Sequence, residues 1–393
     1  MKVLMIGGTG LLGSQTAREL ISRGHSVHSI ALPPLPEGAL LPPEMTLTLK
    51  NSNDMTDEEL KSLFKGVDGF IFAAGVDERI EGPSPIYDFF KKYNITPLER
   101  FLRLAKESGV KHAVIAGSYF SYFAKQWPEM ELGRWHPYIR SRLDQETMAF
   151  SFADEHFDVS VLELPYIFGA QKGRKPVWVF LVEMLRGMKG AVLYPRGGTT
   201  MVTVRQVGEA FAGALERGHG ANAYPIGWFN MTWKEMISVM HRYMGTPKKK
   251  IITIPTWLFA ASAKQIEAKQ RSAGTEGGTV DGEVRRPANE ESLHRPRGGL
   301  CAAGRDGRRH RGRHRRIGYA EHGGYRAKGE GHRHEGRVSH GYTSGRDAKI
   351  TSAFFFFGSA FLRVEEGFNE QRRGIEPRQA HQFRRGTDSV FVK

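Results

Sequence analysis

The chain has 393 residues, 40% of them apolar, with 57 Lys and Arg side chains, 42 Asp and Glu side chains and a single Cys. This length supports a large hydrophobic core, which we expect to be divided between two lobes. One cysteine excludes a disulfide framework and a multi-cysteine zinc site. Because no apolar run reaches the roughly 18 residues of a membrane span and the N-terminus lacks a secretory pattern, we expect a cytoplasmic protein without a membrane partner.

The formal charge of +15 would favour a nucleic-acid partner, but it is distributed unevenly. Residues 1–274 carry 18 Lys and 15 Arg against 27 acidic residues, whereas residues 275–393 carry 3 Lys and 21 Arg against 15 acidic residues. The chain therefore changes character near residue 274, and the two parts are considered separately.

The first part alternates short apolar runs with amphipathic stretches. We predict strands at 2–6, 26–32, 45–49, 69–74, 112–116 and 159–164, and helices at 14–22, 57–64, 97–108 and 138–154. Beyond about residue 169 we expect helices at 177–188 and 233–244, and a strand leading into a helix over 200–215. Near-continuous apolar strands that alternate with helices are typical of a parallel, doubly wound sheet.

This pattern predicts an α/β fold of the Rossmann type with three parts. Residues 1–168 form the predicted dinucleotide-binding domain, and residues 169–274 a smaller C-terminal substrate lobe with returns to the sheet. Residues 275–393 form an Arg- and Gly-rich tail with few aliphatic residues, which cannot bury enough apolar surface to offset its chain entropy.

A glycine-rich loop lies between the first predicted strand and helix, at Gly7, Gly8, Gly10 and Gly13. Glycine permits the tight turn, lets the backbone approach a pyrophosphate and leaves room for the helix to pack on the strand. The helix N-terminus then offers free N–H groups to phosphates. We interpret the loop as a dinucleotide site; a tight turn without a ligand is the alternative.

The end of the second strand leaves the choice between NAD and NADP open. A carboxylate about 20 residues after the glycines would bind the ribose hydroxyls of NAD, but this position has Ala31, Leu32 and Pro33. Neither a carboxylate nor an Arg is present there. Asp54, after the third strand, is a candidate for the adenine side, or equally an acidic residue at a helix N-terminus.

Several motifs, in order, resemble the extended short-chain dehydrogenase/reductases, also called NAD-dependent epimerase/dehydratases, over about residues 1–270. They are GGTGLLG at 7–13, Asn53-Asp54, Ala73-Ala74-Gly75, Asn94, Gly117-Ser118, PYIRSR at 137–142 and PYIFG at 165–169. The resemblance implies that the cofactor is bound by Gly7, Gly8, Thr9, Gly10, Leu11, Leu12, Gly13, Asp54, Ala73, Ala74, Gly75, Asn94, Tyr138, Arg142, Pro165 and Ile167.

The resemblance also implies a catalytic mechanism. Tyr138 matches the tyrosine that moves a proton on the substrate oxygen while hydride passes to or from the nicotinamide, and Ser118 matches the residue that binds the substrate carbonyl. A family lysine four residues after the tyrosine supplies a positive charge; here the residue is Arg142. Arginine has the charge to stabilise a tyrosinate but never gives up its proton, so the proton relay that the resemblance implies for a lysine does not carry over to Arg142.

The predicted substrate is a secondary alcohol or carbonyl of a sugar-like molecule or nucleotide sugar, and we expect a homodimer and no metal. Two alternatives are open. Arg142 favours a catalytically weakened dinucleotide-binding sensor or scaffold. The Arg-rich tail favours a disordered nucleic-acid-binding arm, unless residues 275–393 reflect an altered reading frame, which we favour and which would leave no nucleic-acid partner.

Overall fold

The computed structural model describes residues 1–255, 272 and 274–277. Residues 278–393, which carry most of the Arg-rich segment, lie outside the described residues, and so do the interpretations of the tail as a nucleic-acid-binding arm or as a shifted reading frame. None of the helices in the described ranges is long and apolar enough to cross a membrane.

Seven parallel strands form the main sheet, in the order β11-β7-β6-β4-β1-β2-β3. The chain therefore reverses its direction of winding at β1, which pairs with β2 on one side and β4 on the other. Ligands of such sheets bind beyond the carboxyl ends of the strands at this switch point. The strands are β1 (Lys2–Ile6), β2 (Ser26–Ala31), β3 (Thr46–Leu49), β4 (Gly69–Phe72), β6 (His112–Ala116), β7 (Asp158–Glu163) and β11 (Ala221–Pro225).

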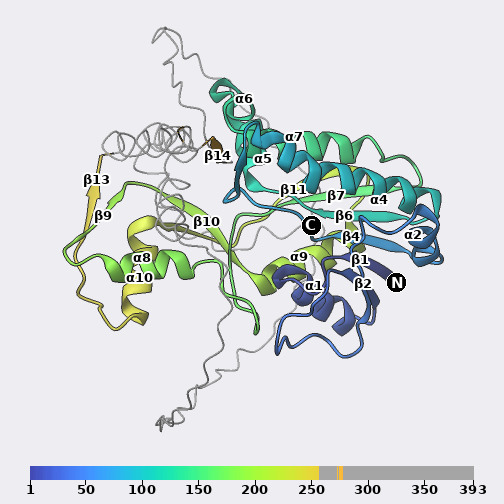
Figure 1. The fold of residues 1–393 in the computed structure, drawn as a ribbon, viewed down its shortest axis with the longest axis horizontal. Helices are drawn as coiled ribbons and strands as arrows, with labels where there is room; N and C mark the ends of the chain where they lie inside the picture. Colours follow the sequence, from blue (N-terminus) through green and yellow to red (C-terminus); the bar gives the residue numbers. More distant parts are fainter. Residues whose placement is uncertain (256–271, 273, 278–393) are drawn as a thin grey trace, which may run out of the picture. The chain divides into compact units, whose positions relative to one another are not determined.

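Helices cover both faces of this sheet, which confirms the predicted doubly wound α/β fold. On one face, α1 (Leu11–Ser22) packs beside α9 (Val204–Arg217). On the other lie α2 (Asp57–Phe64), α4 (Thr96–Glu107) and α7 (Pro137–Phe150) (Figure 1). Both β11 and α9 come from the part of the chain after residue 169, so the C-terminal region returns to the sheet.

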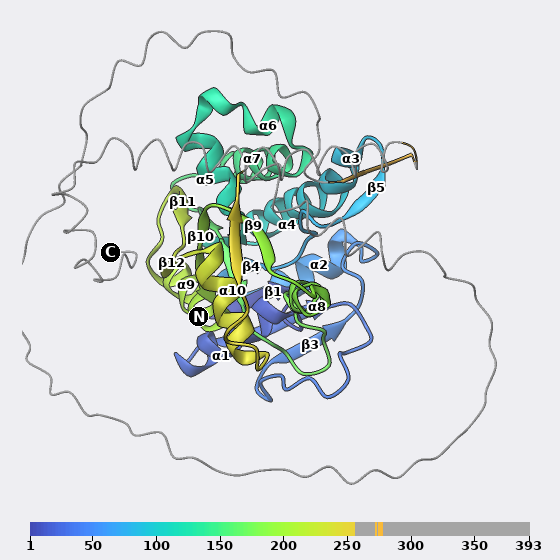
Figure 2. The ribbon, with the colours of Figure 1, turned by 90° about the vertical axis from the view of Figure 1, so that its left-hand side faces the viewer.

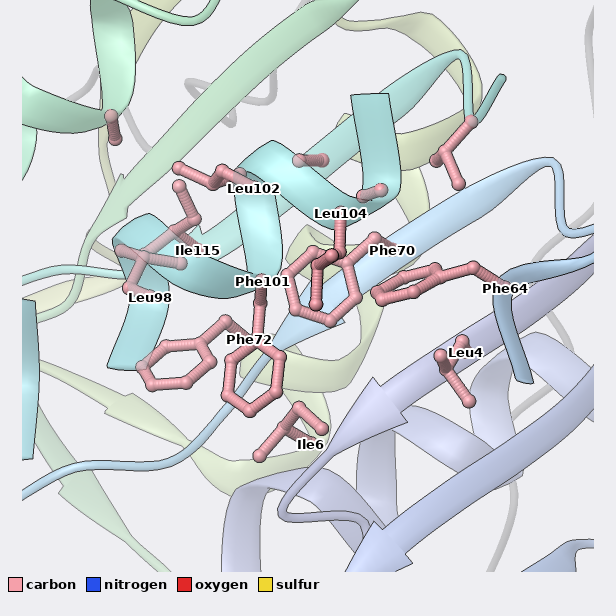
Figure 3. Packing of buried hydrophobic residues seen from close by; sticks show 14 of the residues in the cluster. Leu4, Ile6, Phe64, Phe70, Phe72, Leu98, Phe101, Leu102, Leu104 and Ile115 are labelled. Atoms are coloured by element: carbon pink, nitrogen blue, oxygen red, sulfur yellow. The ribbon is translucent and has the colours of Figure 1, made fainter. Parts of the chain in front are cut away.

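The alternation of side chains along the central strands creates two apolar layers. Leu4 and Ile6 on β1 point to the face covered by α2 and α4, where they meet a cluster of phenylalanines (Figure 3). Val3 and Met5 point to the opposite face and pack with residues of α1 and α9. Both faces of β1 are thus buried, which explains why its sequence is continuously apolar.

A smaller group of elements stands to one side of the main sheet (Figures 1 and 2). It contains a three-stranded sheet of β8 (Tyr166–Phe168), β10 (Gly198–Thr203) and β12 (Phe229–Thr232), and a parallel pair of β9 (Val192–Pro195) and β13 (Ile251–Ile254). The helices here are α8 (Val179–Gly187) and α10 (Trp233–Tyr243). Capping boxes at Thr203/Gln206 and Thr232/Glu235 explain where α9 and α10 begin.

Some boundaries differ from the sequence-based prediction. The helix predicted over 138–154 ends at Phe150, because the chain turns into a bridge between Asp154 and Phe157, so its predicted extension is wrong. The helical elements that were not predicted are α3 (Ile86–Phe90), a π-helical turn (Lys91–Ile95), α5 (Tyr119–Gln126), a 3-10 turn (Pro128–Met130) and α6 (Leu132–Trp135). The strands that were not predicted are β5 (Glu81–Pro83), β8, β9, β11, β12, β13 and β14 (Thr275–Gly277). β14 pairs with β5, so the first residues assigned to the tail join the fold.

Candidate active site

The glycine loop follows β1 at the switch point of the sheet. Gly7 has a positive φ of 93°, and a Cβ atom there would lie 2.7 Å from the Ala73 carbonyl oxygen. At Gly13 a Cβ atom would lie 2.2 Å from the Gly7 carbonyl oxygen, inside the turn itself. Real side chains do not fit at such distances, so the loop between β1 and α1 requires glycine at both positions.

Gly10 is less crowded than Gly7, Gly8 and Gly13. It is the N-cap of α1 and has no side chain to cap the helix. A Cβ atom at Gly10 would lie 3.2 Å from the Gly7 carbonyl oxygen, and Gly10, Leu11 and Leu12 line a cavity. An uncapped helix N-terminus that opens into a cavity suits a phosphate group. This part of the chain therefore fits the pyrophosphate of a dinucleotide.

The cavity has a volume of about 320 Å³ and brings together residues from both groups of elements. Of the site residues predicted from the sequence, it is lined by Gly10, Leu11, Leu12, Ala73, Ala74, Gly75, Ser118, Tyr138, Arg142, Pro165 and Ile167. The other predicted residues, Gly7, Gly8, Thr9, Gly13, Asp54 and Asn94, lie outside the lining. Gly7 and Gly13 shape the loop through close contacts with backbone atoms, and Gly8 packs closely against the side chain of Ser29.

Asp54 and Asn94 occupy different kinds of position. Asp54 is exposed and accepts a hydrogen bond from Asn51 Nδ2 at 2.8 Å. Asn94, fully buried in the π-helical turn, accepts a hydrogen bond from Val76 N at 2.8 Å and donates one to the Val76 carbonyl at 3.0 Å. Asn94 therefore holds the segment after β4 in place, next to the cavity.

Tyr138 and Arg142 come from the first two turns of α7 and are both buried, with 3% and 8% of their surface exposed. Arg142 Nε donates to the Tyr138 hydroxyl at 3.0 Å. The remaining N–H groups of Arg142 donate to the Val76 carbonyl at 3.1 Å, to Gln145 Oε1 at 2.9 Å and, more weakly, to the Ala116 carbonyl at 3.4 Å. The guanidinium thus joins the ends of β4 and β6 to α7.

Ser118 ends the loop after β6 and is the N-cap of α5, where its side chain accepts a hydrogen bond from Phe120 N at 3.3 Å. It also hydrogen-bonds to Tyr138. The structure therefore brings Ser118 at the start of α5 together with Tyr138 and Arg142 of α7 in one wall of the cavity.

Burial dominates the ionisation of Tyr138. It raises the pKa of the phenol to about 12, because the ionised form loses its hydration, and the nearby carboxyls of Glu78 and Asp77 add to the rise. Arg142 and the hydrogen bond from Ser118 act in the opposite direction. Tyr138 is therefore a neutral hydrogen-bond donor at neutral pH unless a further positive charge enters the cavity.

Sequence reasoning missed the charged segment Asp77-Glu78-Arg79, which lines the cavity. One signal was available: the segment follows the carboxyl end of the central strand β4, where ligands of such sheets bind. Two tyrosines also line the cavity. Tyr119 ranked below Tyr138 because no basic residue follows it four positions on, and Tyr166 stood in the PYIFG motif without a role of its own.

Metal ligands are not gathered in the part of the chain that the structure describes. No group of three or more His, Cys, Asp or Glu side chains there is arranged to hold an ion.

Comparison with known proteins identifies relatives at the level of family and fold. A profile of the NAD dependent epimerase/dehydratase family matches residues 3–227. No curated protein matches the sequence. Similar solved structures include a nucleoside-diphosphate-sugar epimerase from Pseudomonas aeruginosa, with 16% identity and a TM-score of 0.50, which covers 72% of this chain and 88% of that chain.

Two further structures have the same degree of similarity. A UDP-glucose 4-epimerase from Thermotoga maritima, solved with UDP-glucose, has 21% identity and a TM-score of 0.50 over 65% of this chain and 86% of its own. A dTDP-glucose 4,6-dehydratase from Streptomyces venezuelae, solved with NAD, has 16% identity and a TM-score of 0.50 over 65% of this chain and 84% of its own. At these identities the likeness shows a shared Rossmann-type fold.

Proposed function

This chain belongs to the NAD dependent epimerase/dehydratase family, and we propose that it is an enzyme that uses NAD to oxidise or reduce a secondary alcohol or carbonyl carbon of a nucleotide sugar. One observation carries the proposal: Tyr138, 3.0 Å from Arg142 Nε, lines the same cavity as the uncapped N-terminus of α1. A proton-transferring group and a dinucleotide site thus share one space.

The bound cofactor would supply a carbon that accepts or donates hydride. The backbone of Gly10, Leu11 and Leu12 would bind its pyrophosphate, and Ala73–Gly75, Pro165 and Ile167 would enclose its reactive end. Ser118 would donate to the substrate oxygen, while Tyr138 gives or takes the proton on that oxygen. Arg142 would stabilise the ionised phenol without itself exchanging a proton.

Two measurements test this proposal. Fluorescence titration of the full chain with NADH and NADPH in parallel tests cofactor binding, and we expect a clear preference for NADH. Turnover is then measured with UDP-glucose and dTDP-glucose. We expect Tyr138→Phe to lower kcat by about 10²- to 10⁴-fold, the usual contribution of general acid–base catalysis, while NADH affinity stays within about threefold.

Tyr122→Phe is the matched control. Tyr122 lies on α5, close to Ser118 in the sequence but outside the cavity lining. The same loss of a phenolic hydroxyl at this position leaves turnover unchanged. Equal turnover of Tyr138→Phe and the wild type would reject the catalytic assignment.

A catalytically weakened dinucleotide sensor is the second candidate. It is favoured by the high pKa of Tyr138, about 12, and by the engagement of Arg142 with backbone carbonyls and Gln145. The two candidates separate cleanly. A sensor binds NADH with high affinity but turns over neither sugar nucleotide, and its NADH binding is insensitive to Tyr138→Phe.

A further inference from the structure

Glu78 is a cavity-lining carboxyl to which the mechanism above gives no role. It lies in the segment Val76–Arg79, which follows β4 and lines the cavity. Asn94 and Arg142 hold this segment in place through hydrogen bonds to the backbone of Val76. Among the described residues its carboxyl has neither an ion pair nor a side-chain hydrogen bond, and its hydrogen bond is to its own backbone amide. Glu78 is therefore free to exchange a proton with whatever occupies the cavity.

The charged groups around Glu78 come from four elements. On its own segment, Asp77 and Arg79 are paired with each other, with Arg79 Nε donating to Asp77 Oδ1 at 3.0 Å. Arg142 and Tyr138 from α7, Tyr119 from α5 and Tyr166 from β8 line the same cavity as Glu78, which is itself half-buried. Because the Asp77–Arg79 pair is internally compensated, Arg142 and Glu78 remain as the two opposite charges of the cavity.

Oxidation of a secondary alcohol creates a need for a proton acceptor here. The reaction removes a hydride from carbon and a proton from oxygen, and the hydride leaves with the cofactor. Arg142 cannot take the proton, since a guanidinium already holds all its protons and keeps them. Tyr138 can pass the proton on, but its buried phenol already holds a proton and is a poor place to leave a negative charge.

We propose that Glu78 is the proton acceptor of this cavity, receiving the alcohol proton by way of the Tyr138 hydroxyl and returning it when a carbonyl is reduced. This inference rests on the proposed function. The O–H bond of the alcohol breaks and an O–H bond forms on the Glu78 carboxylate, while the C–H bonding electrons leave as hydride to the oxidised nicotinamide.

Charge balance explains why a carboxylate suits this position. The oxidised nicotinamide carries one positive charge and the reduced ring carries none. Before the reaction, ionised Glu78 offsets one of the two positive charges of Arg142 and the oxidised ring; afterwards, the ring and the carboxyl are both neutral and the charge of Arg142 remains. Transfer of the alcohol proton to Glu78 therefore keeps the net charge of the cavity constant through hydride transfer, and a change of net charge is what a site shielded from water penalises.

The ionisation of Glu78 is suited to this exchange. Burial raises its pKa to about 7, with a further rise from Asp77, while Arg79 and Arg142 lower it. A positive ring in the cavity therefore favours the ionised carboxylate, and a neutral ring favours the protonated acid. By linkage, oxidised NAD binds more tightly as Glu78 ionises, that is, as pH rises through about 7.

The test uses the full chain and two nucleotides, with no sugar substrate. NADH affinity is measured by fluorescence and NAD⁺ affinity by competition, from about pH 6 to about pH 8, together with proton release on binding in weakly buffered solution. We expect the preference for NAD⁺ over NADH to rise about fivefold over this range, as one unit of pKa coupling gives. NAD⁺ binding near pH 7 releases about half a proton more than NADH binding does.

Three variants give the assignment its controls. Glu78→Gln abolishes both the pH dependence of the preference and the proton release. Glu78→Asp, which keeps a carboxyl, retains part of both. Glu81→Gln makes the same chemical change three residues along the chain, at an exposed position outside the cavity, and behaves like the wild type.

The outcomes separate this inference from the proposed function. If neither nucleotide binds to the folded wild type, the proposed function fails and the inference fails with it. If both bind but the ratio of their affinities is independent of pH, or if Glu78→Gln keeps the wild-type proton release, the inference alone is overturned.

Discussion

The glycine loop and the side chains on another part of the lining, here called the wall, border one cavity, but they depend on different physical effects. The loop is made of consecutive residues and works because side chains are missing, so that backbone atoms of Gly7, Gly13 and Ala73 come into contact. The wall is made of Glu78, Ser118, Tyr138 and Arg142, which come from three places in the chain: the segment after β4, the start of α5 and helix α7. The loop depends on steric exclusion at Gly7 and Gly13, whereas the wall depends on charges and hydrogen bonds brought together from distant segments.

The largest expected effect breaks the loop. A methyl group in Gly13→Ala would lie 2.2 Å from the Gly7 carbonyl oxygen and 2.7 Å from Gly8 Cα. Because both contacts are backbone atoms, they cannot be relieved by a side-chain movement. We expect the free energy of unfolding to fall by about 3 kcal/mol, at the upper end of common single substitutions, and NADH binding to be lost, as measured by urea denaturation and fluorescence titration.

Gly187→Ala is the matched control for that change. Gly187 ends α8, and a Cβ atom there meets nothing within 4 Å. The same added methyl group should change the free energy of unfolding by less than about 1 kcal/mol. If Gly13→Ala proved equally harmless, the loop would not depend on close backbone contact.

The next effect concerns Glu163, a buried carboxyl outside the cavity, whose ionisation can be compared with that of Glu78 in the wall. Glu163 at the end of β7 is 1% exposed and pairs with Lys125 Nζ at 2.9 Å, as does Glu146. Burial raises the pKa of Glu163 from 4.5 to about 7, so the folded state retains a proton that the unfolded chain releases. Its contribution to stability is complete below pH 4.5 and is lost as pH rises to about 7.

Glu163→Gln should remove that dependence. We expect the wild type to lose about 2 to 3 kcal/mol relative to the variant between about pH 4.5 and pH 8, at about 1.4 kcal/mol per pKa unit. Urea denaturation at several pH values measures this difference, with the exposed Glu155→Gln as the control. A constant difference across the range would show that Lys125 keeps Glu163 ionised in the folded state.

The smallest expected effect tests the several hydrogen-bond donors of the Arg142 guanidinium. Arg142→Lys keeps the charge beside Tyr138 but loses donors to the Val76 carbonyl and to Gln145. We expect the free energy of unfolding to fall by about 1 to 2 kcal/mol, as for one or two buried hydrogen bonds. NADH affinity should change by less than about threefold. A loss of stability as large as that of Gly13→Ala would place Arg142 among the residues that the fold cannot replace.

Much of the fold could be predicted from the sequence because its signals are local. Continuous apolar runs marked β1, β4 and β6, and the apolar period marked α2 and α4 to within a residue. The strands that were not predicted are short, with three to five residues each: β5, β8, β9, β11, β12, β13 and β14. They exist because other elements pair with them, and such pairing is not encoded locally.

In the candidate site, too, the residues marked by local motifs were predicted, whereas their long-range contacts were not. Gly10, Ser118, Tyr138 and Arg142 could be placed by motif, and the structure brings them to one cavity. The sequence did not indicate that Arg142 would donate a hydrogen bond to the Val76 carbonyl, or that Asn94 would accept one from the Val76 amide. These partners lie 66 and 18 residues away, and hydrogen bonds over such separations depend on how the strands end relative to α7.

The sequence by itself determined the glycine loop and the succession of central strands and helices along the chain. Steric exclusion at a turn and the pattern of apolar residues both act between residues that are close together in the sequence. Only the tertiary structure decided that Glu78 lines the cavity with Tyr138, Tyr119 and Tyr166. The ionisation of a carboxyl depends on burial and on charges brought from distant segments, and neither can be read from the residues on either side of it.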